Sequence, residues 1–587
     1  MKILLAAMNA KYIHSNLAVY ELSSYAREYK EHIELAEYTI NNQLEFILSD
    51  IYKRKPDVLA LSCYIWNIGM IDELLAEFRK IMPDTPVWLG GPEVSYDLTT
   101  GMLTKDYVDG IMIGEGEKTF LELTRHYVDG DIALNEIKGI AYKWNGEILV
   151  NAYREAMDLS EVPFPYDDLE KFKNKIIYYE TSRGCPYSCS YCLSSIERGV
   201  RLRNIDLVKR ELQFFLDHNV PQVKFIDRTF NCNHNHAMTI WTYIHEHDNG
   251  ITNFHFEISA DILRDDEIEL LNKMRPGLVQ LEIGVQSTNV DTIHAINRKM
   301  DFQVLTDKVN AVQRAKNIHQ HLDLIAGLPY EDYNSFANSF NDVYDLRPNQ
   351  LQLGFLKVLK GSPIFAEAQK GTIIYRQSAP YEVLCTKWLP FDDVLRLKQV
   401  EEMTEVYYNS GQFEYSIRFL EHFFEGPFYL YQTLGEYYEV NGLFGLNHNR
   451  MARYQILADF LQSFLKDKEN AGEVMEAFEE ILLFDLYFRE NLKSRPAFAK
   501  DYGIHKKLYR KLYDDQEWTR NNLKGYEDYS SKVLGRITHA EYFSVDVEKT
   551  ALSGMIVKEP NVVVFDYKNR DVLNHQAGTI KVPYINE

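Results

Sequence analysis

Three cysteines within eight positions constrain this chain more than any other feature of its sequence. They lie in Glu180-Thr-Ser-Arg-Gly-Cys185-Pro-Tyr-Ser-Cys189-Ser-Tyr-Cys192, directly after an apolar run at 176–179 that predicts a buried strand. Cysteine thiolates are the natural ligands of iron–sulfur clusters. A short loop with three of them can ligate three irons of a four-iron cluster and leave the fourth iron open to a cofactor or substrate. Gly184 and Pro186 favour the turns that would bend the chain around such a metal.

Three other interpretations of these cysteines stay open. Cys189 and Cys192 alone form a C-x-x-C pair, which also occurs in thioredoxin-like redox sites and in half of a zinc site. A structural zinc needs four ligands, and no second cysteine pair or nearby histidine follows at the usual spacing. Disulfides are not expected because the N-terminal residues show no secretion signal. The third alternative is a coincidental grouping.

The pattern C-x-x-x-C-x-aromatic-C after a strand resembles the signature of the radical S-adenosylmethionine (SAM) enzymes. The resemblance implies that Cys185, Cys189 and Cys192 ligate a [4Fe-4S] cluster and that the amino and carboxylate groups of SAM chelate its open iron. Reduction of the cluster would then cleave SAM to a 5′-deoxyadenosyl radical. Tyr191 matches the aromatic residue that lies near the adenine in that family.

Length and charge limit the remaining possibilities. A chain of 587 residues is too long for one hydrophobic core and predicts two to four domains. No apolar run reaches the length of a transmembrane helix, so we expect no membrane span and a cytoplasmic protein. The net charge of −22 argues against nucleic acid as a general partner.

The first third of the chain alternates strands and helices, as a parallel, doubly wound sheet does. The predicted strands are 2–8, 33–38, 58–62, 87–89 and 111–113, and the predicted helices are 17–29, 44–52, 68–81 and a helix that begins at Glu117. Ligands of such sheets bind beyond the carboxyl ends of the strands, where this chain has glycine-rich and polar turns. Each turn taken alone could equally be a tight connection without a ligand.

This order of elements, ahead of the cysteine motif, resembles the cobalamin-binding domain of the cobalamin-dependent radical SAM class. The stretches Leu89-Gly-Gly-Pro92 and Gly114-Glu-Gly-Glu117 match its recurrent turns. The Asp-x-His-x-x-Gly motif that supplies an axial histidine in other cobalamin proteins is absent. The resemblance implies cobalamin as a further cofactor, with contacts from Asn9, His14, Ser62, Gly90, Gly91, Pro92, Gly114 and Gly116. A degenerate domain that has lost the cofactor is the alternative.

A connector and a second alternating region follow. Residues 140–144 and 147–150 predict a β-hairpin around Asn145-Gly146, and Val162-Pro-Phe-Pro165 predicts an extended linker. Further predicted strands are 223–226, 254–258, 279–285, 322–326 and 351–358, and further predicted helices are 207–218, 236–247, 265–274 and 304–316. Repeated units of this kind build a full or partial α/β barrel whose chemistry lies at the carboxyl ends of the strands.

Polar residues gather at those strand ends. Leu281-Glu-Ile-Gly-Val-Gln-Ser287 resembles the fourth-strand segment of the radical SAM family, and Asp323-Leu-Ile-Ala-Gly-Leu-Pro329 resembles its sixth-strand adenine motif. Asp227 stands where the family contacts the SAM amino group, although the family's Gly-Gly-Glu is missing. The resemblance thus implies SAM contacts from Tyr191, Asp227, Glu257, Glu282, Gln286, Ser287, Arg298, Gly327 and Pro329. For Glu257 and Arg201 an ion-paired or solvated side chain is an equal alternative.

Beyond about residue 365, tyrosine and phenylalanine become dense and helical patterns dominate, at 394–408, 428–440, 451–466 and 471–489. Strands are predicted within 556–567. This part resembles an accessory domain found with cobalamin-type radical SAM proteins.

The predicted fold class is α/β in three main parts. Residues 1–135 form a flavodoxin- or Rossmann-like, doubly wound parallel sheet. Residues 136–170 form a connector, residues 171–365 a partial (β/α)6 barrel that is the radical SAM core, and residues 366–587 a mainly helical C-terminal domain with terminal strands.

The resemblance implies an enzyme that cleaves SAM reductively, with an electron from a flavodoxin or ferredoxin. With cobalamin it would be a C-methyltransferase, or a cyclase or oxidoreductase, on a substrate that the sequence does not identify. One rival is a tRNA methylthiotransferase, which needs three further cysteines in its N-terminal domain, where this chain has Cys63. The other rival is a non-catalytic iron–sulfur scaffold or sensor.

Overall fold

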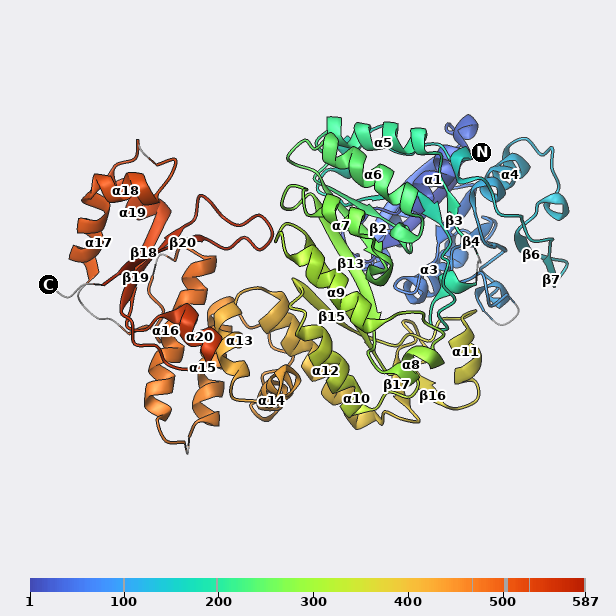
Figure 1. Ribbon diagram of the computed structural model, residues 1–587. Coiled ribbons are helices and arrows are strands. Elements are labelled where there is room, and N and C mark those ends of the chain that lie inside the picture. The colour runs from blue at the N-terminus through green and yellow to red at the C-terminus, as the bar shows by residue number, and fades with distance from the viewer. Residues whose placement is uncertain are drawn as a thin grey trace. The chain divides into compact units, whose positions relative to one another are not determined.

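The computed structural model describes residues 1–584 apart from 99–100, 197–198, 467, 493, 501–504 and 527, and it leaves the side chains of 505–508 undescribed. The chain forms two compact units, Met1–Asp332 with Gly354–Phe391 and Tyr333–Leu353 with Asp392–Glu587 (Figure 1). No helix in the described part is long and apolar enough to cross a membrane.

The first unit begins with a seven-stranded sheet in the order β2-β1-β3-β4-β5-β6-β7. Its strands are β1 (Ile3–Asn9), β2 (Ile33–Thr39), β3 (Val58–Ser62), β4 (Val87–Gly90), β5 (Gly110–Met112), β6 (Ile140–Trp144) and β7 (Glu147–Val150). The helices between them are α1 (Leu17–Tyr25), α2 (Leu44–Arg54), α3 (Ile68–Ile81) and α4 (Glu117–Val128). Strands β1 to β5 are parallel, which confirms the doubly wound sheet.

Helices cover both faces of this sheet because alternate residues of its strands enter two separate cores. Leu4 of β1 packs in one core with Phe78 of α3. Its neighbour Leu5 lies in the other core with Phe120 of α4. The continuous apolar sequence of β1, buried at every position, follows from this arrangement.

The predicted hairpin around Asn145-Gly146 is present, and both turn residues have the positive φ angles, 51° and 84°, of a primed turn. Strand β6 pairs antiparallel with β5, so the hairpin extends the first sheet, where we had expected a connector. The apolar side chains of Ile140 and Ala141 explain this position, since each is buried in one of the two cores of the sheet.

The second sheet has the order β15-β14-β13-β12-β11-β8. Its strands are β8 (Ile177–Tyr179), β11 (Gln222–Phe225), β12 (Asn253–Ile258), β13 (Val279–Gln286), β14 (His319–Ala326) and β15 (Gln350–Phe355). The helices of this region are α5 (Ile205–Asp217), α6 (His234–Glu246), α7 (Asp265–Leu271), α8 (Val290–Ala295) and α9 (Phe302–Gln313), and β9 (Ser182–Arg183) and β10 (Arg201–Leu202) form a small antiparallel pair. Strands β8 and β11 to β14 pair in parallel. This open sheet with its helices is the predicted partial barrel.

The first unit ends with α11 (Pro363–Ala368) and an antiparallel hairpin of β16 (Ile373–Tyr375) and β17 (Val383–Thr386). Ile373 and Val383 pack in one core with Leu328 and Leu356. The expected domain boundary near residue 365 therefore falls inside a helix, and the compact unit continues to Phe391.

The second unit is mainly helical. Its helices are α10 (Tyr333–Tyr344), α12 (Phe391–Thr404), α13 (Glu414–Glu421), α14 (Pro427–Val440), α15 (Arg450–Phe464), α16 (Ala471–Arg489), α17 (His505–Asp514), α18 (Gln516–Asn522), α19 (Ser531–Ile537) and α20 (Val547–Ser553). An antiparallel sheet is formed by β18 (Thr538–Phe543), β19 (Asn561–Asp566) and β20 (Gly578–Pro583). The predicted strands at 556–567 thus correspond to β19, the middle strand of that sheet.

Candidate active site

The loop of Cys185, Cys189 and Cys192 follows β8 and is fixed at several points. Gly184 has a φ of 96°, and a side chain there would collide with the backbone oxygen of Gly199, so glycine is required. The Ser190 amide donates to the Ile296 carbonyl at 2.8 Å, and the Ile364 amide donates to the Ser190 carbonyl at 2.9 Å. The loop is therefore tied both to the end of α8 and to the start of α11.

The three thiols are free and differ in their surroundings. The Cys185 sulfur lies 3.5 Å from the Thr229 hydroxyl, and the Cys189 sulfur lies 3.9 Å from a guanidinium nitrogen of Arg298. Burial raises the pKa of the Cys189 thiol, and the Arg298 charge opposes that rise.

Among the described residues, no three His, Cys, Asp or Glu side chains converge closely enough to hold a metal by themselves. The thiols thus share one bent loop without closing around a metal. Three thiolate donors on such a loop fit a [4Fe-4S] cluster chemically.

Arg298 brings several of the expected SAM residues together. Its guanidinium donates to the Tyr191 hydroxyl at 3.3 Å and also to the Gly284 carbonyl. Gly284 has no room for a side chain, because the amide group of Gln286 occupies that space. Arg298 therefore links Tyr191 and Cys189 to the Gly284 peptide, against which Gln286 packs.

Asp227 lies at the end of β11 but is fully buried and engaged within the protein. It accepts hydrogen bonds from the Thr181 amide at 2.9 Å, the Thr181 hydroxyl at 2.6 Å and the Ser182 hydroxyl at 2.6 Å. Burial raises the pKa of Asp227 to about 6, although these hydrogen bonds act against the rise. Its visible role is to hold the segment that leads into the cysteine loop, rather than to present a carboxylate to a ligand.

Glu282 lies in a polar layer that crosses the barrel sheet. Its carboxylate is 2.9 Å from the Lys224 ammonium on β11 and 2.9 Å from Nε2 of His255 on β12. Burial acts to raise the pKa of Glu282, but the nearby His255 and Lys224 outweigh burial and lower this pKa to about 2. On β14, His321 Nε2 lies 3.0 Å from Asp323.

Lys224, His255 and His321 were not among the residues predicted from the sequence. The signal that would have found them is the alternation of strand residues. In β13, Val279, Leu281, Ile283 and Val285 are buried, whereas Gln280, Glu282, Gly284 and Gln286 are less buried and share the opposite face. Glu257 pairs in register with Glu282, and burial raises the pKa of Glu257 to about 7, with Arg228 opposing the rise.

Replacing Glu282 by glutamine should destabilise the cluster-free protein by roughly 1–3 kcal/mol at pH 7, because Lys224 loses its carboxylate partner. The folded-state pKa of Glu282 lies below its usual value, so this stabilisation is present above about pH 4.5 and is lost as the pH falls toward about 2. Urea unfolding at pH 7 and pH 4 measures the difference. A deficit that stays constant or grows on acidification would contradict this assignment.

Ser287, Gly327 and Pro329 are placed by internal contacts. The buried Ser287 hydroxyl donates to Glu331 at 2.6 Å. Gly327 has a φ of 87°, and a side chain there would lie 2.7 Å from Val383. Pro329 is buried. These contacts fix the shape of the chain at the end of β14, and a role of the three residues in SAM binding stays a prediction.

The residues expected near cobalamin gather at the carboxyl ends of β1, β3, β4 and β5. Asn9 donates to the His14 carbonyl at 3.0 Å, and Nδ1 of His14 is 2.7 Å from the Tyr178 hydroxyl of β8. Asn16 donates to the Ser62 hydroxyl at 3.3 Å. Burial lowers the pKa of His14.

The glycine turns have different space around them. At Gly91, which lies between Gly90 and Pro92, a side chain would lie 2.5 Å from the Cys63 carbonyl oxygen. The turns that follow β3 and β4 are therefore in direct contact at Gly91. At Gly116 a side chain would meet Leu22 at 2.9 Å, whereas Gly114, with a φ of 74°, faces open space. Packing against Leu22 favours glycine at position 116, and the positive φ favours glycine at position 114. Of these two glycines, only Gly114 leaves room for a ligand to approach the backbone.

Arg183 joins the cysteine loop to the last of these turns. This arginine, two residues before Cys185, lies 2.7 Å from Glu117, 3.5 Å from Glu115, 2.7 Å from Glu180 and 3.7 Å from Glu21. Arg201 also contacts Glu115. No motif in the sequence indicated this cluster, because its members come from four separate segments.

Comparison with known protein families assigns the two sheets of the first unit to two different domains. The family model for the B12 binding domain matches residues 3–124, and the model for the radical SAM superfamily matches residues 179–343. The chain combines a B12-binding domain with a radical SAM domain. A third model, described as a protein of unknown function (DUF4080), matches residues 369–565. The radical SAM domain implies a [4Fe-4S] cluster and SAM, and the B12-binding domain implies cobalamin.

Individual relatives are distant. The chain is 25% identical over 337 residues to the cobalamin-dependent radical SAM methyltransferase TokK of Streptomyces tokunonensis, covering 53% of this chain and 48% of TokK. It is 26% identical over 318 residues to 2-(S-pantetheinyl)-carbapenam-3-carboxylate methyltransferase of Streptantibioticus cattleyicolor, covering 49% and 45%. The chain thus spans about half the length of these curated relatives.

Among solved structures, the cobalamin-dependent SAM radical enzyme OxsB with aqua-cobalamin and SAM bound has a TM-score of 0.57 and 18% identity, covering 82% of this chain and 80% of OxsB. This similarity concerns the fold. It shows that the B12-binding and radical SAM domains of this chain have the arrangement of strands and helices found in such enzymes.

Proposed function

We propose that this protein is a cobalamin-dependent radical SAM enzyme that transfers a methyl group to a carbon atom of its substrate. The observation that carries the proposal is the Arg183 cluster. It fastens the Gly114–Glu117 turn of the B12-binding domain to the residues directly before Cys185, so the two cofactor loops share one set of ion pairs. The methyltransferase names of the relatives support a transferase.

The protein's own part in this chemistry is ligation and positioning. Cys185, Cys189 and Cys192 would hold the cluster, and when bound the cofactors supply a 5′-deoxyadenosyl radical and a transferable methyl group. Arg298 keeps Tyr191 and the Gly284 peptide beside the cysteine loop. Asp227 fixes the strand end from which that loop departs.

The polar layer of the barrel would receive the substrate. Glu257 has a pKa of about 7 and stands in register beside the ion-paired Glu282, so it can accept or donate a proton near neutral pH. Cyclase or oxidoreductase chemistry would use the same residues and is the second candidate within this class.

The proposal includes a flavodoxin- or ferredoxin-type protein as electron donor and the cytoplasm as the place of action. A tRNA methylthiotransferase is disfavoured because Cys63, which would have to help ligate a second cluster, is fully buried and its thiol pKa is raised by burial. A non-catalytic iron–sulfur scaffold differs from the proposal in a measurable way, since it would not cleave SAM.

The proposal is tested by anaerobic reconstitution with iron, sulfide and hydroxocobalamin, followed by SAM and dithionite. Mass spectrometry of the nucleosides distinguishes the cases. 5′-Deoxyadenosine indicates radical SAM chemistry, and S-adenosylhomocysteine beside it indicates methyl transfer through cobalamin. 5′-Deoxyadenosine without S-adenosylhomocysteine, despite bound cobalamin, would favour the cyclase or oxidoreductase candidate.

A further inference from the structure

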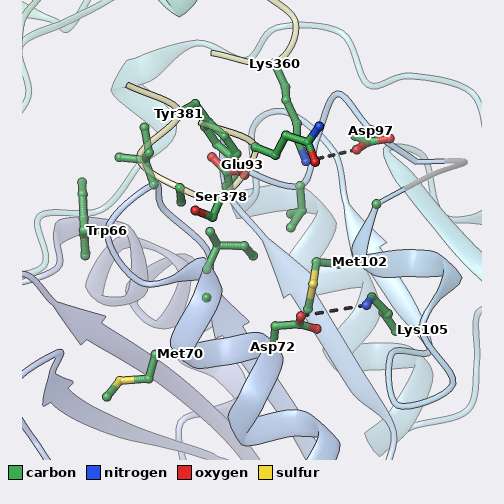
Figure 2. Close-up of a pocket in the computed structure, with 17 residues that line it drawn as sticks. Trp66, Met70, Asp72, Glu93, Asp97, Met102, Lys105, Lys360, Ser378 and Tyr381 are labelled. Carbon is green, nitrogen blue, oxygen red and sulfur yellow. Dashed lines mark hydrogen bonds and ion pairs between the residues drawn. The ribbon is translucent and has the colours of Figure 1, made fainter. Parts of the chain in front are cut away.

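A cavity of about 400 Å³ adjoins the turns that follow β3 and β4 (Figure 2). Its walls come from residues 65, 66, 68–70 and 72 around the start of α3, from 93, 94, 97, 101, 102 and 105 after β4, and from Lys360 with 377–379 and 381. The last wall includes residues at the start of the region matched by the DUF4080 model. The chemistry described so far assigns this cavity no ligand.

One wall of the cavity is formed by the indole ring of Trp66, which two contacts hold in place. The Trp66 indole nitrogen donates to the Met8 carbonyl at 3.0 Å, and the indole stacks on Tyr64 at 4.4 Å with an interplanar angle of 5°. Trp66 nevertheless remains 42% exposed. Met70 and Met102 also line the space and add apolar, adaptable surface.

The charged groups at the cavity are already paired with one another. Lys360 lies 3.1 Å from Asp97, and the Tyr381 hydroxyl donates to Glu93. Lys105 and Asp72 form a looser pair at 3.9 Å. An ionic ligand would have to break these pairs. A neutral ligand with amide groups can add hydrogen bonds to them without doing so.

The position of the cavity narrows the choice of ligand. Glu93 directly follows the Gly90–Pro92 turn, and Gly91 is packed against the Cys63 backbone at the end of β3. Ligands of parallel sheets lie beyond such strand ends. The cavity is too small for a whole cobalamin and has the size of a pocket for one part of a larger ligand.

We propose that this cavity receives the amide-bearing edge of the corrin ring of cobalamin, and that Lys360 and Tyr381 close the cofactor site over it. The inference rests on the proposed function, in which cobalamin is bound at these strand ends. The apolar surface of the corrin ring matches the apolar wall at Trp66. Its neutral amide groups match the Lys360–Asp97 and Tyr381–Glu93 pairs, which need no further charge. The first residues of the DUF4080 region thereby acquire a cofactor-binding role.

Gly69 offers a direct test. It lies in the first turn of α3, lines the cavity, and a side chain on it would meet no atom within 4 Å. Gly69→Phe should therefore fill the cavity without a clash, and Gly69→Ala should leave it open. Gly472→Phe is the matched control, because Gly472 occupies the first turn of α16 in the other unit and also faces open space.

The probes are hydroxocobalamin and diaquacobinamide, which shares the corrin amides but lacks the nucleotide tail. Affinity is measured on the cluster-loaded protein by absorbance titration and by quenching of tryptophan fluorescence. Gly69→Phe should raise the Kd for both corrinoids at least about 10-fold, which corresponds to about 1.4 kcal/mol of binding free energy. Gly472→Phe should bind as the wild type does, Gly69→Ala should lose less affinity than Gly69→Phe, and all variants should keep the same iron content.

Equal affinity of Gly69→Phe and wild type for both corrinoids would overturn the inference while leaving cobalamin binding intact. Weaker binding of hydroxocobalamin alone would place the nucleotide tail in the cavity and would also overturn it. Wild-type protein that binds neither corrinoid would refute cobalamin dependence together with the inference. If Gly69→Phe does not fold, Met102→Trp fills the same cavity from a different segment and must give the same loss.

Discussion

Replacing Cys189 by alanine is expected to remove the cluster and to lower SAM cleavage by more than about 100-fold. Loss of a ligand should exceed the 10- to 100-fold effects that follow from altering a ligand's outer neighbours. Cys189 is the most deeply buried cysteine of the motif, and its removal would leave Arg298 beside an incomplete ligand set. Iron and sulfide analysis of the reconstituted protein, with the 5′-deoxyadenosine assay, measures the effect.

Cys385→Ala is the matched control, because Cys385 is also a free thiol of this unit and lies on β17, outside the motif. It should keep the full iron content and rate. Cys189→Ala protein with wild-type iron content would contradict the assignment of the ligands.

Replacing Arg183 by glutamine should cause the largest loss of stability, about 3–5 kcal/mol, as expected when one partner of a buried ion pair is removed. The side chain of Arg183 is only 16% exposed and faces Glu21, Glu115, Glu117 and Glu180. Without the guanidinium these carboxylates would repel one another. Urea unfolding of the cluster-free protein at pH 8 measures the deficit.

The deficit of Arg183→Gln should shrink as the pH is lowered. The pKa of Glu21 is raised, first by burial and then by the neighbouring Glu180 charge. A carboxyl with a raised folded-state pKa destabilises the fold as the pH rises through that pKa, and this cost disappears when the group is protonated. Arg183→Lys should recover part of the stability. A deficit below about 1 kcal/mol, typical of surface pairs, would show that the cluster does not hold the two loops together.

Much of this architecture could be predicted because local sequence patterns determine it. The bounds of α3, α16, β3, β6 and β7 agree with the predicted ranges to the residue. The apolar periodicity of these elements is pronounced, and the residues that end them lie next to them in the sequence. The short helix α8 was not predicted because a helix of fewer than two turns gives too little periodicity to recognise.

The candidate site was predictable only where a contiguous motif carried it. Cys189, Tyr191 and Arg298, each named by a contiguous motif, contact one another, whereas Asp227 turns inward to Thr181 and Ser182. The Arg183 cluster and the Lys224–Glu282 pair join residues that are distant in sequence. Such contacts depend on tertiary packing, for which one sequence holds no local signal.

The most direct test of the central claim is the formation of 5′-deoxyadenosine from SAM by the reduced, reconstituted protein. The wild type should form it, and the Cys185→Ala, Cys189→Ala, Cys192→Ala triple variant, treated identically, should not. Formation of 5′-deoxyadenosine by both proteins at the same rate, or a wild-type protein that assembles no cluster able to bind SAM, would contradict the account.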